Sequence, residues 1–195
     1  MFPSYDTEHL LMCLLRKFNI NTSEVKIIHY PTLVQFQNGE VEVFGAYVIN
    51  EPVWAKLRGI DVDVLPPSDF GVEFYSDTII TTKKYYSSNQ DILKRFLRAA
   101  SRGWSFAEKN PDEAVNLMYE VVRGSIGEGE PKEHQIGMSR KAVEYLRAGP
   151  DNLNFYMEKS RWDEMETLLY DIGRLKSKGH VANLCDFTMV ERALK

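Results

Sequence analysis

The feature of the sequence that most constrains the fold is a change of pattern around Pro66-Pro67. Before it, short apolar segments of strand character alternate with short helices, and beyond residue 82 every periodic segment is helical. Strands that alternate with helices are typical of a parallel α/β sheet. The sequence therefore predicts an α/β fold, in which a small lobe with a parallel-type sheet precedes a mostly helical region.

The expected elements follow from the spacing of apolar residues and from caps. Runs rich in β-branched and aromatic residues predict strands at 25–30, 44–49, 60–65 and 76–82. Helical spacing predicts helices at 7–18, 31–38, 51–58, 90–108, 111–122, 131–147 and 161–172, and a short helix after Asp186. The later helices need a sheet to cover their apolar faces, so we expect part of that sheet to be missing from the chain.

Composition narrows the classes of function. The 195 residues include 24 Lys and Arg against 28 Asp and Glu, which gives a net charge of -4 and argues against a general nucleic-acid binder. No apolar run approaches the length of a membrane span, which is about 18 residues or more. The first residues lack the basic and apolar regions of a secretion signal, so we expect no signal peptide in this sequence.

Cysteine and histidine show no pattern of a metal or catalytic site. Cys13 lies within an apolar helical pattern, Cys185 lies near the other end, and the four histidines are scattered. Neither cysteine has a second ligand at metal-binding spacing, and two distant thiols make no disulfide framework. We therefore expect no catalytic residue, metal or cofactor, and a buried structural role for Cys13.

Polar and aromatic residues gather at the ends of the expected strands, where ligands collect in open α/β sheets. The candidate ligand-binding residues are Tyr5, Tyr47, Asn50, Glu51, Tyr75 and Asp77. An Asn amide donates and accepts hydrogen bonds and an ionised Glu accepts them, so Asn50-Glu51-Pro52 could recognise a planar heterocycle with an amino group. The same three residues are also typical of a helix start with Asn50 as N-cap. The sequence leaves both interpretations open.

Other aromatic and basic residues have ordinary structural interpretations beside the functional ones. Tyr47 and Tyr75 could stack on a flat ligand or belong to the core, whereas Trp54 and Trp104 lie on apolar helical faces and are expected in the core. Lys83-Lys84 could hold an anion or form a Schiff base, but adjacent lysines where a strand meets a helix are usually solvated.

A series of short segments in the first part of the chain carries a resemblance to a known family. They are Asn38-Gly39-Glu40-Val41-Glu42-Val43, Tyr47-Val48-Ile49-Asn50-Glu51-Pro52, Gly59-Ile60-Asp61-Val62, Pro67-Ser68-Asp69-Phe70-Gly71, Phe74-Tyr75-Ser76-Asp77-Thr78 and Thr81-Thr82. Later segments continue the series: Arg95-Phe96-Leu97-Arg98-Ala99, Gly103-Trp104, Asn110-Pro111-Asp112-Glu113-Ala114, Arg161-Trp162 and Leu168-Leu169-Tyr170-Asp171-Ile172-Gly173. In this order, the segments resemble the NMT1/THI5-like solute-binding proteins.

The resemblance implies a fold of the type II periplasmic-binding-protein class, in which two α/β lobes close on a ligand. Residues 1–75 would then be the second lobe. Residues 76–195 would be a crossover strand and the helical part of the first lobe, whose N-terminal half would be absent. The isolated chain would then be expected to self-associate, to pair with another chain or to pack its helices loosely, and to bind ligand weakly.

The resemblance also implies a function. The chain would be a ligand-binding module, either the substrate-binding component of an ABC transporter or a sensor module, for a small and pyrimidine-like thiamine precursor. Its partners would be a permease or a fused signalling domain, and its location periplasmic or extracytoplasmic if it is part of a longer secreted chain.

By match to the family's Asn-Glu turn, Asn50 and Glu51 would contact the ligand, Tyr47 and Tyr75 would form walls, and Asp77 would lie near the hinge. The alternatives are an enzyme of thiamine-pyrimidine biosynthesis related to the fungal synthase and a truncated fragment that binds nothing. The Cys-rich motif of that enzyme is absent from the sequence, which favours binding over catalysis.

Overall fold

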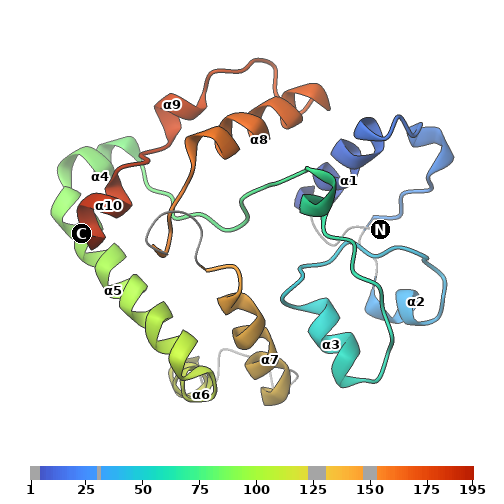
Figure 1. The fold of residues 1–195 in the computed structure, drawn as a ribbon, viewed down its shortest axis with the longest axis horizontal. Helices are drawn as coiled ribbons and strands as arrows, with labels where there is room; N and C mark the ends of the chain where they lie inside the picture. The colour runs from blue at the N-terminus through green and yellow to red at the C-terminus, as the bar shows by residue number, and fades with distance from the viewer. Residues whose placement is uncertain (1–4, 30–31, 123–130, 147–152) are drawn as a thin grey trace. The chain divides into compact units, whose positions relative to one another are not determined.

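A computed structural model describes residues 5–29, 32–122, 131–146 and 153–195, which form helices and irregular segments (Figure 1). The chain divides into two compact units. The first unit combines Met1–Tyr75 with Ser160–Leu184, and the second combines Ser76–Lys159 with Cys185–Lys195. The assignment of 1–75 and 76–195 to two lobes of a binding protein stays a prediction.

The predicted α/β fold is wrong for this structure, because the described residues contain no β-strand and no sheet. The four expected strands are extended or turning segments, and apolar residues within them are exposed: Ile79 by 50%, Ile80 by 86% and Leu65 by 67%. A strand forms only when a neighbouring strand completes its backbone hydrogen bonds. The residue types of a segment indicate that it tends to form a strand, but they do not show whether a second strand lies beside it.

The first unit is built from short helices joined by irregular segments. They are α1 (Tyr5–Lys17), η1 (Thr22–Glu24), α2 (Leu33–Gln37), α3 (Glu51–Leu57), η2 (Pro67–Phe70), α8 (Lys159–Asp171, of which Lys159 falls in the second unit) and α9 (Val181–Leu184). Local sequence explains several of the bounds. In α2, Thr32 and Gln35 form a reciprocal capping box. Gly173 ends α8 with a φ of 75°, a left-handed conformation that glycine adopts without strain.

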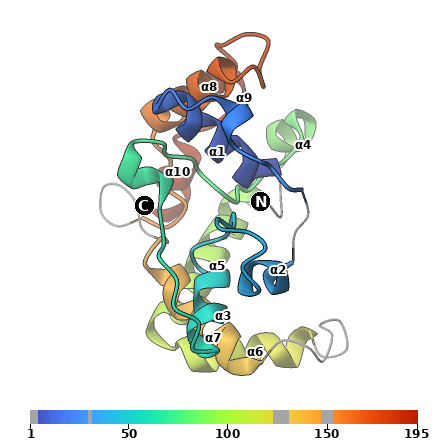
Figure 2. The same ribbon diagram turned by 90° about the vertical axis from the view of Figure 1, so that its right-hand side faces the viewer.

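Contacts between α1 and α8 join the two chain segments of the first unit, and Figure 2 shows these helices next to each other. The buried Cys13 thiol of α1 lies 4.0 Å from the carbonyl oxygen of Leu168 in α8. Arg174, just beyond α8, pairs with Glu8 of α1 at 3.1 Å. The helix predicted at 161–172 thus packs against the N-terminal helix. The periodicity of its own sequence does not reveal this contact.

The second unit is organised around the long helix α5. Its helices are α4 (Lys83–Ser88), α5 (Gln90–Lys109), α6 (Pro111–Val122), α7 (Lys132–Val143) and α10 (Met189–Leu194). Helix α5 contacts each of the others. Its buried Leu97 packs against Met189 and Ala193 of α10. Arg140 of α7 pairs with Asp112 of α6 at 2.7 Å, which ties these two helices together.

Asp186 holds α10 in place. One carboxylate oxygen accepts hydrogen bonds from the Thr188 backbone, the Thr188 hydroxyl and the Met189 backbone, at 2.8, 2.8 and 3.1 Å. The other oxygen accepts hydrogen bonds from the Tyr86 hydroxyl and the Arg192 guanidinium. Burial opposes ionisation of Asp186, but these donors and the positive charge of Arg192 together lower its pKa. The carboxylate therefore joins the C-terminal helix to α4.

The apolar stripe of α5 is covered only in part. Leu97 is buried, whereas Ile92, Phe96 and Trp104 are exposed by 43%, 52% and 37%. The prediction that Trp104 belongs to the core is therefore wrong. The stripe is wider than the surface that α10 covers, and the sheet expected to cover the rest is absent from the described residues.

We expect this uncovered part of the stripe to make the 195-residue chain self-associate. Fully burying a Leu, Ile or Phe side chain stabilises a structure by roughly 1.5–3 kcal/mol, so covering several of them favours association. Phe96→Asp should shift the chain toward monomer in light scattering. Arg95→Gln, which lowers the charge equally at an ion-paired position on the same helix, should leave the size unchanged. A monodisperse monomer for the unsubstituted chain would contradict the expectation.

A second prediction concerns Glu166, a buried carboxylate of α8. It accepts hydrogen bonds from the backbone amides of Gly179 and His180 at 2.8 and 2.7 Å, which lower its pKa. A lowered pKa stabilises the fold above the pKa of the unfolded carboxyl, about 4.3, and this stabilisation is lost as pH falls through the folded value. The Glu166→Gln variant should therefore have a lower free energy of unfolding at neutral pH. Its stability should also fall less than that of the unsubstituted chain as the pH is lowered.

Thermal unfolding of the chain between pH 7 and pH 3 measures this effect. Glu164→Gln, an exposed carboxylate of the same helix, is the control and should behave like the unsubstituted chain. If both variants follow the same pH profile, Glu166 does not hold residues 179–180 in solution.

The third prediction concerns the reactivity of the two thiols. Burial, followed by the nearby charge of Asp171, raises the pKa of Cys13 to about 11. The thiolate is the nucleophile. At pH 8 the fraction of Cys13 in the thiolate form should be about a hundredfold smaller than that of an ordinary thiol. Iodoacetamide labelling followed by mass spectrometry should therefore modify the less buried Cys185 first. Labelling of Cys13 in the folded chain as fast as Cys185 would contradict this result.

Candidate functional site

The Asn50-Glu51 turn forms one compact polar arrangement at the start of α3. The backbone amide of Asn50 donates to the carbonyl of Tyr47 at 2.8 Å and closes the turn. The Glu51 carboxylate folds back over it: Oε2 accepts from the Tyr47 backbone N–H at 2.8 Å, and Oε1 accepts from the Asn50 side-chain amide at 3.2 Å. Three of the predicted site residues are thus brought together by local hydrogen bonds.

This geometry bears on both interpretations of the turn. Asn50 occupies the N-cap position and Pro52 lies in the first turn, as a helix start requires. The Asn50 side chain, however, makes no capping hydrogen bond and donates to Glu51 instead. Each carboxylate oxygen has a second lone pair, so Glu51 can accept a further donor while it holds the turn. The arrangement presents a half-buried carboxylate in a fixed orientation, beside the exposed ring of Tyr47.

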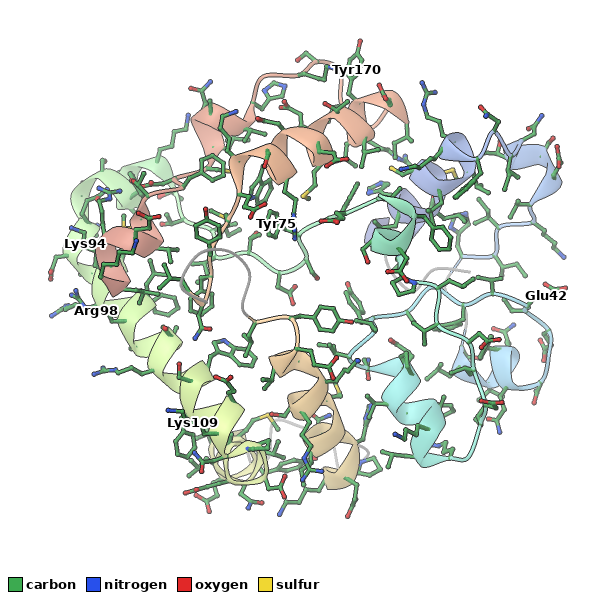
Figure 3. The ribbon with its side chains drawn as sticks, viewed as in Figure 1. Glu42, Tyr75, Lys94, Arg98, Lys109 and Tyr170 are labelled. Carbon is green, nitrogen blue, oxygen red and sulfur yellow. The ribbon has the colours of Figure 1, made fainter. Side chains whose placement is uncertain are left out.

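Tyr75 belongs to a second cluster in the same unit (Figure 3). Its ring stacks on Trp162 with 5.4 Å between centroids and 27° between planes. The Arg161 guanidinium carbon lies 5.2 Å from the Tyr75 centroid, and Arg161 also pairs with Glu73 at 3.0 Å. The Tyr75 backbone N–H donates to the sulfur of Met165 at 3.1 Å. Three residues of α8 therefore hold Tyr75 in position.

Arg161 and Trp162 are the functional candidates that residue patterns miss. The Trp162 indole nitrogen is buried and has no hydrogen-bond partner among the residues that the structure describes. A buried donor without an acceptor is unfavourable, so Trp162 can offer a hydrogen bond to a group that reaches it. The two residues lie far from Tyr75 in sequence, and the family resemblance is the one sequence signal that singles them out.

The remaining predicted site residues lie elsewhere. Asp77 is exposed at a bend of the second unit. Tyr5 opens α1, but its side chain lies outside the described part of the structure. Lys83 and Lys84 are exposed in the first turn of α4. The structure therefore shows part of the predicted site as a turn and another part as a separate aromatic cluster. That all six residues belong to one ligand site stays a prediction.

Neither a metal-binding cluster nor a membrane-spanning helix occurs among the described residues. No group of three or more His, Cys, Asp and Glu side chains in these ranges is arranged to hold a metal ion. Among the described helices, none combines the length and apolar character that a membrane crossing requires.

Comparison with known proteins gives a consistent result. The model of the family described as NMT1/THI5 like matches residues 1–114, more than half of the chain. The formylaminopyrimidine-binding protein of Halalkalibacterium halodurans is 34% identical over 77 residues, which are 39% of this chain and 23% of that protein. The riboflavin-binding protein RibY of Chloroflexus aurantiacus is 28% identical over 98 residues, which are 50% of this chain and 28% of that protein.

The matched regions thus span about a quarter of the length of these two relatives. The family match includes the Asn50-Glu51 turn and Tyr75, while Arg161 and Trp162 lie beyond it. The resemblance seen in the sequence motifs is confirmed: the chain belongs to the NMT1/THI5-like family.

Proposed function

We propose that this chain is part of a small-molecule-binding protein that recognises a planar nitrogen heterocycle with an amino group and does not convert it. The observation that carries the proposal is the Glu51 carboxylate, which the Tyr47 N–H and the Asn50 amide hold in a fixed orientation. The names of both relatives specify ligands that contain a planar nitrogen heterocycle, a pyrimidine and a flavin. A pyrimidine precursor of thiamine is the ligand that we favour.

In this proposal Glu51 accepts a hydrogen bond from the amino group of the ring, and Asn50 complements a neighbouring ring atom. Tyr47, which is 38% exposed, offers a ring face for stacking. Tyr75 already has Trp162 and Arg161 as ring partners, so it serves as a positioned wall. Asp77 remains a proposed residue near the hinge on the basis of the family resemblance. Tyr5 remains a proposed contact because it belongs to the polar and aromatic residues that gather at the ends of the expected strands.

The wider context is also proposed. Binding would favour a closed arrangement of two lobes, because the ligand contacts both of them only when they close. A permease or a fused signalling domain would read that closure, and the protein would act in the periplasm or outside the cell. An enzyme of thiamine-pyrimidine biosynthesis is the second candidate, and the names of both relatives, which are binding proteins, favour binding over it.

The test is the affinity of the 195-residue chain for formylaminopyrimidine, measured by ligand-detected NMR because we expect weak binding. Glu51→Gln should weaken binding by about 1.5–3 kcal/mol, the usual contribution of a hydrogen bond to a charged group, which is roughly ten- to hundredfold in affinity. Gln retains the size of the side chain and can still accept from Tyr47.

Glu42→Gln is the matched control, since Glu42 is an exposed carboxylate of the same unit (Figure 3). It should leave the affinity unchanged. Equal affinity of the Glu51→Gln variant and the unsubstituted chain would remove Glu51 from the site. Recovery of a chemically altered ligand by mass spectrometry would favour the enzyme instead.

A further inference from the structure

The exposed residues of α5 follow the spacing of a coiled-coil contact. Ile92, Phe96, Ala99, Gly103 and Phe106 succeed one another at alternating intervals of four and three residues. All of them are exposed, and a side chain at Gly103 would find no atom within 4 Å of its Cβ. This row of α5 can therefore take the side chains of a second helix, which can approach most closely at Ala99 and Gly103.

Helix α6 carries a shorter row with the same spacing. Ala114, Leu117 and Val121 are three and four residues apart. Ala114 is half-buried, whereas Leu117 is exposed by 47% and Val121 by 85%. Exposed apolar residues that form a continuous row, unlike single ones, are typical of contact surfaces. Both helices of the second unit thus present an unfilled apolar row.

Charged residues of opposite sign flank the two rows. They are Arg102 and Lys109 on α5, and Glu113 and Glu120 on α6. All four are exposed, and none of their side chains makes a hydrogen bond or an ion pair among the described residues. On each helix the two charges are seven residues apart, which is about two helical turns or about 10.5 Å. The two rows therefore match in charge as well as in spacing.

An antiparallel alignment of α5 with α6 of a second copy fills both rows. It sets a small residue against a larger one in three successive layers, which are Ala99 with Val121, Gly103 with Leu117 and Phe106 with Ala114. Layers that combine a small and a large side chain let two helices approach closely without leaving a void between them. The apolar residues of the two helices are thus complementary in size.

The same alignment brings the unpaired charges together. Arg102 lies beside Glu120 of the second copy, and Lys109 lies beside Glu113, in the flanking positions where coiled coils form ion pairs between helices. A contact between two α5 helices would instead set basic residues against each other, because Arg95, Arg102 and Lys109 all flank this row. Charge therefore favours α6 over α5 as the partner of the α5 row.

We propose that two copies of this chain form a two-fold dimer in which α5 of each copy packs antiparallel against α6 of the other. A two-fold axis exchanges the copies, so each copy supplies both rows and the two contacts are identical. The dimer gives the self-association expected from the exposed residues of α5 a defined surface and stoichiometry. The contact uses the second unit alone, whereas the candidate heterocycle turn belongs to the first.

Sedimentation of the 195-residue chain over a series of concentrations measures the dimer. Arg102→Glu and Glu120→Arg should each raise the dimer dissociation constant at least about tenfold, because each replaces two ion pairs per dimer by two contacts between like charges. The double variant should restore the dimer, since the ion pairs form again with exchanged signs. Lys84→Glu is the matched control: it changes the charge of the same unit equally, at an exposed residue of α4, and should leave the dissociation constant unchanged.

Gly103→Gln tests the close approach of the helices without a change of charge. Glutamine forms helices better than glycine and finds open space at this position, so the variant should unfold at a higher temperature under conditions where the chain is monomeric. In the dimer its side chain would take the place of Leu117, so the dissociation constant should rise at least about tenfold. An unsubstituted chain that is monomeric or larger than a dimer, a double charge variant as weak as the single ones, or an unchanged Gly103→Gln dimer would overturn the proposal.

Discussion

The first compact unit depends on α8, whose side chains meet segments that find no partner in a sheet. The Tyr75 backbone N–H, just before the expected strand at 76–82, donates to the sulfur of Met165. The thiol of Cys13 lies against the Leu168 carbonyl, and Arg161 pairs with Glu73. Buried polar groups must find such partners, because leaving them unpaired costs more than a hydrogen bond gains. A helix late in the chain thus ties α1 to the segment that contains Glu73 and Tyr75.

The candidate heterocycle site combines two kinds of interaction. The Asn50-Glu51 turn is held by hydrogen bonds between residues four positions apart or fewer, so it can form wherever this sequence stands. The Tyr75 and Trp162 pair is held by packing between distant segments, so it exists only when α8 is in place. A local turn orients the carboxylate that we propose for ligand recognition, and a long-range contact positions the aromatic ring that we propose as a wall.

The second unit uses the two faces of α5 differently. Its apolar side packs on α10 through Leu97, and its basic side, with Arg98 and Arg102, lines a pocket of about 340 Å³. Helix α10 links the two, because Ala193 contributes to the core and its carbonyl accepts from Arg98. Asp186 fixes α10 by accepting from Tyr86, Arg192 and the first residues of the helix. The carboxylate therefore supports the pocket without belonging to it.

Local features of the structure could be predicted from the sequence, whereas long-range features could not. The helices at 51–58, 90–108 and 111–122 were predictable, and their observed bounds differ by one residue or less, because capping, proline placement and helical spacing act over a few positions. The Asn50-Glu51 turn was predictable as a pair for the same reason. The expected strands were wrong, because a strand needs a partner that spacing cannot supply.

Only the tertiary structure decided which distant residues meet. Neither periodicity nor composition pairs Tyr75 with Trp162, or places Asn154 against two serines of α5. Family motifs marked Trp162 as notable but did not say what it contacts. By itself, the sequence determined where this chain forms helices and one polar turn. The tertiary structure decided what those elements contact. Packing depends on where distant segments of the chain lie in space, whereas capping depends on residues a few positions away in the sequence.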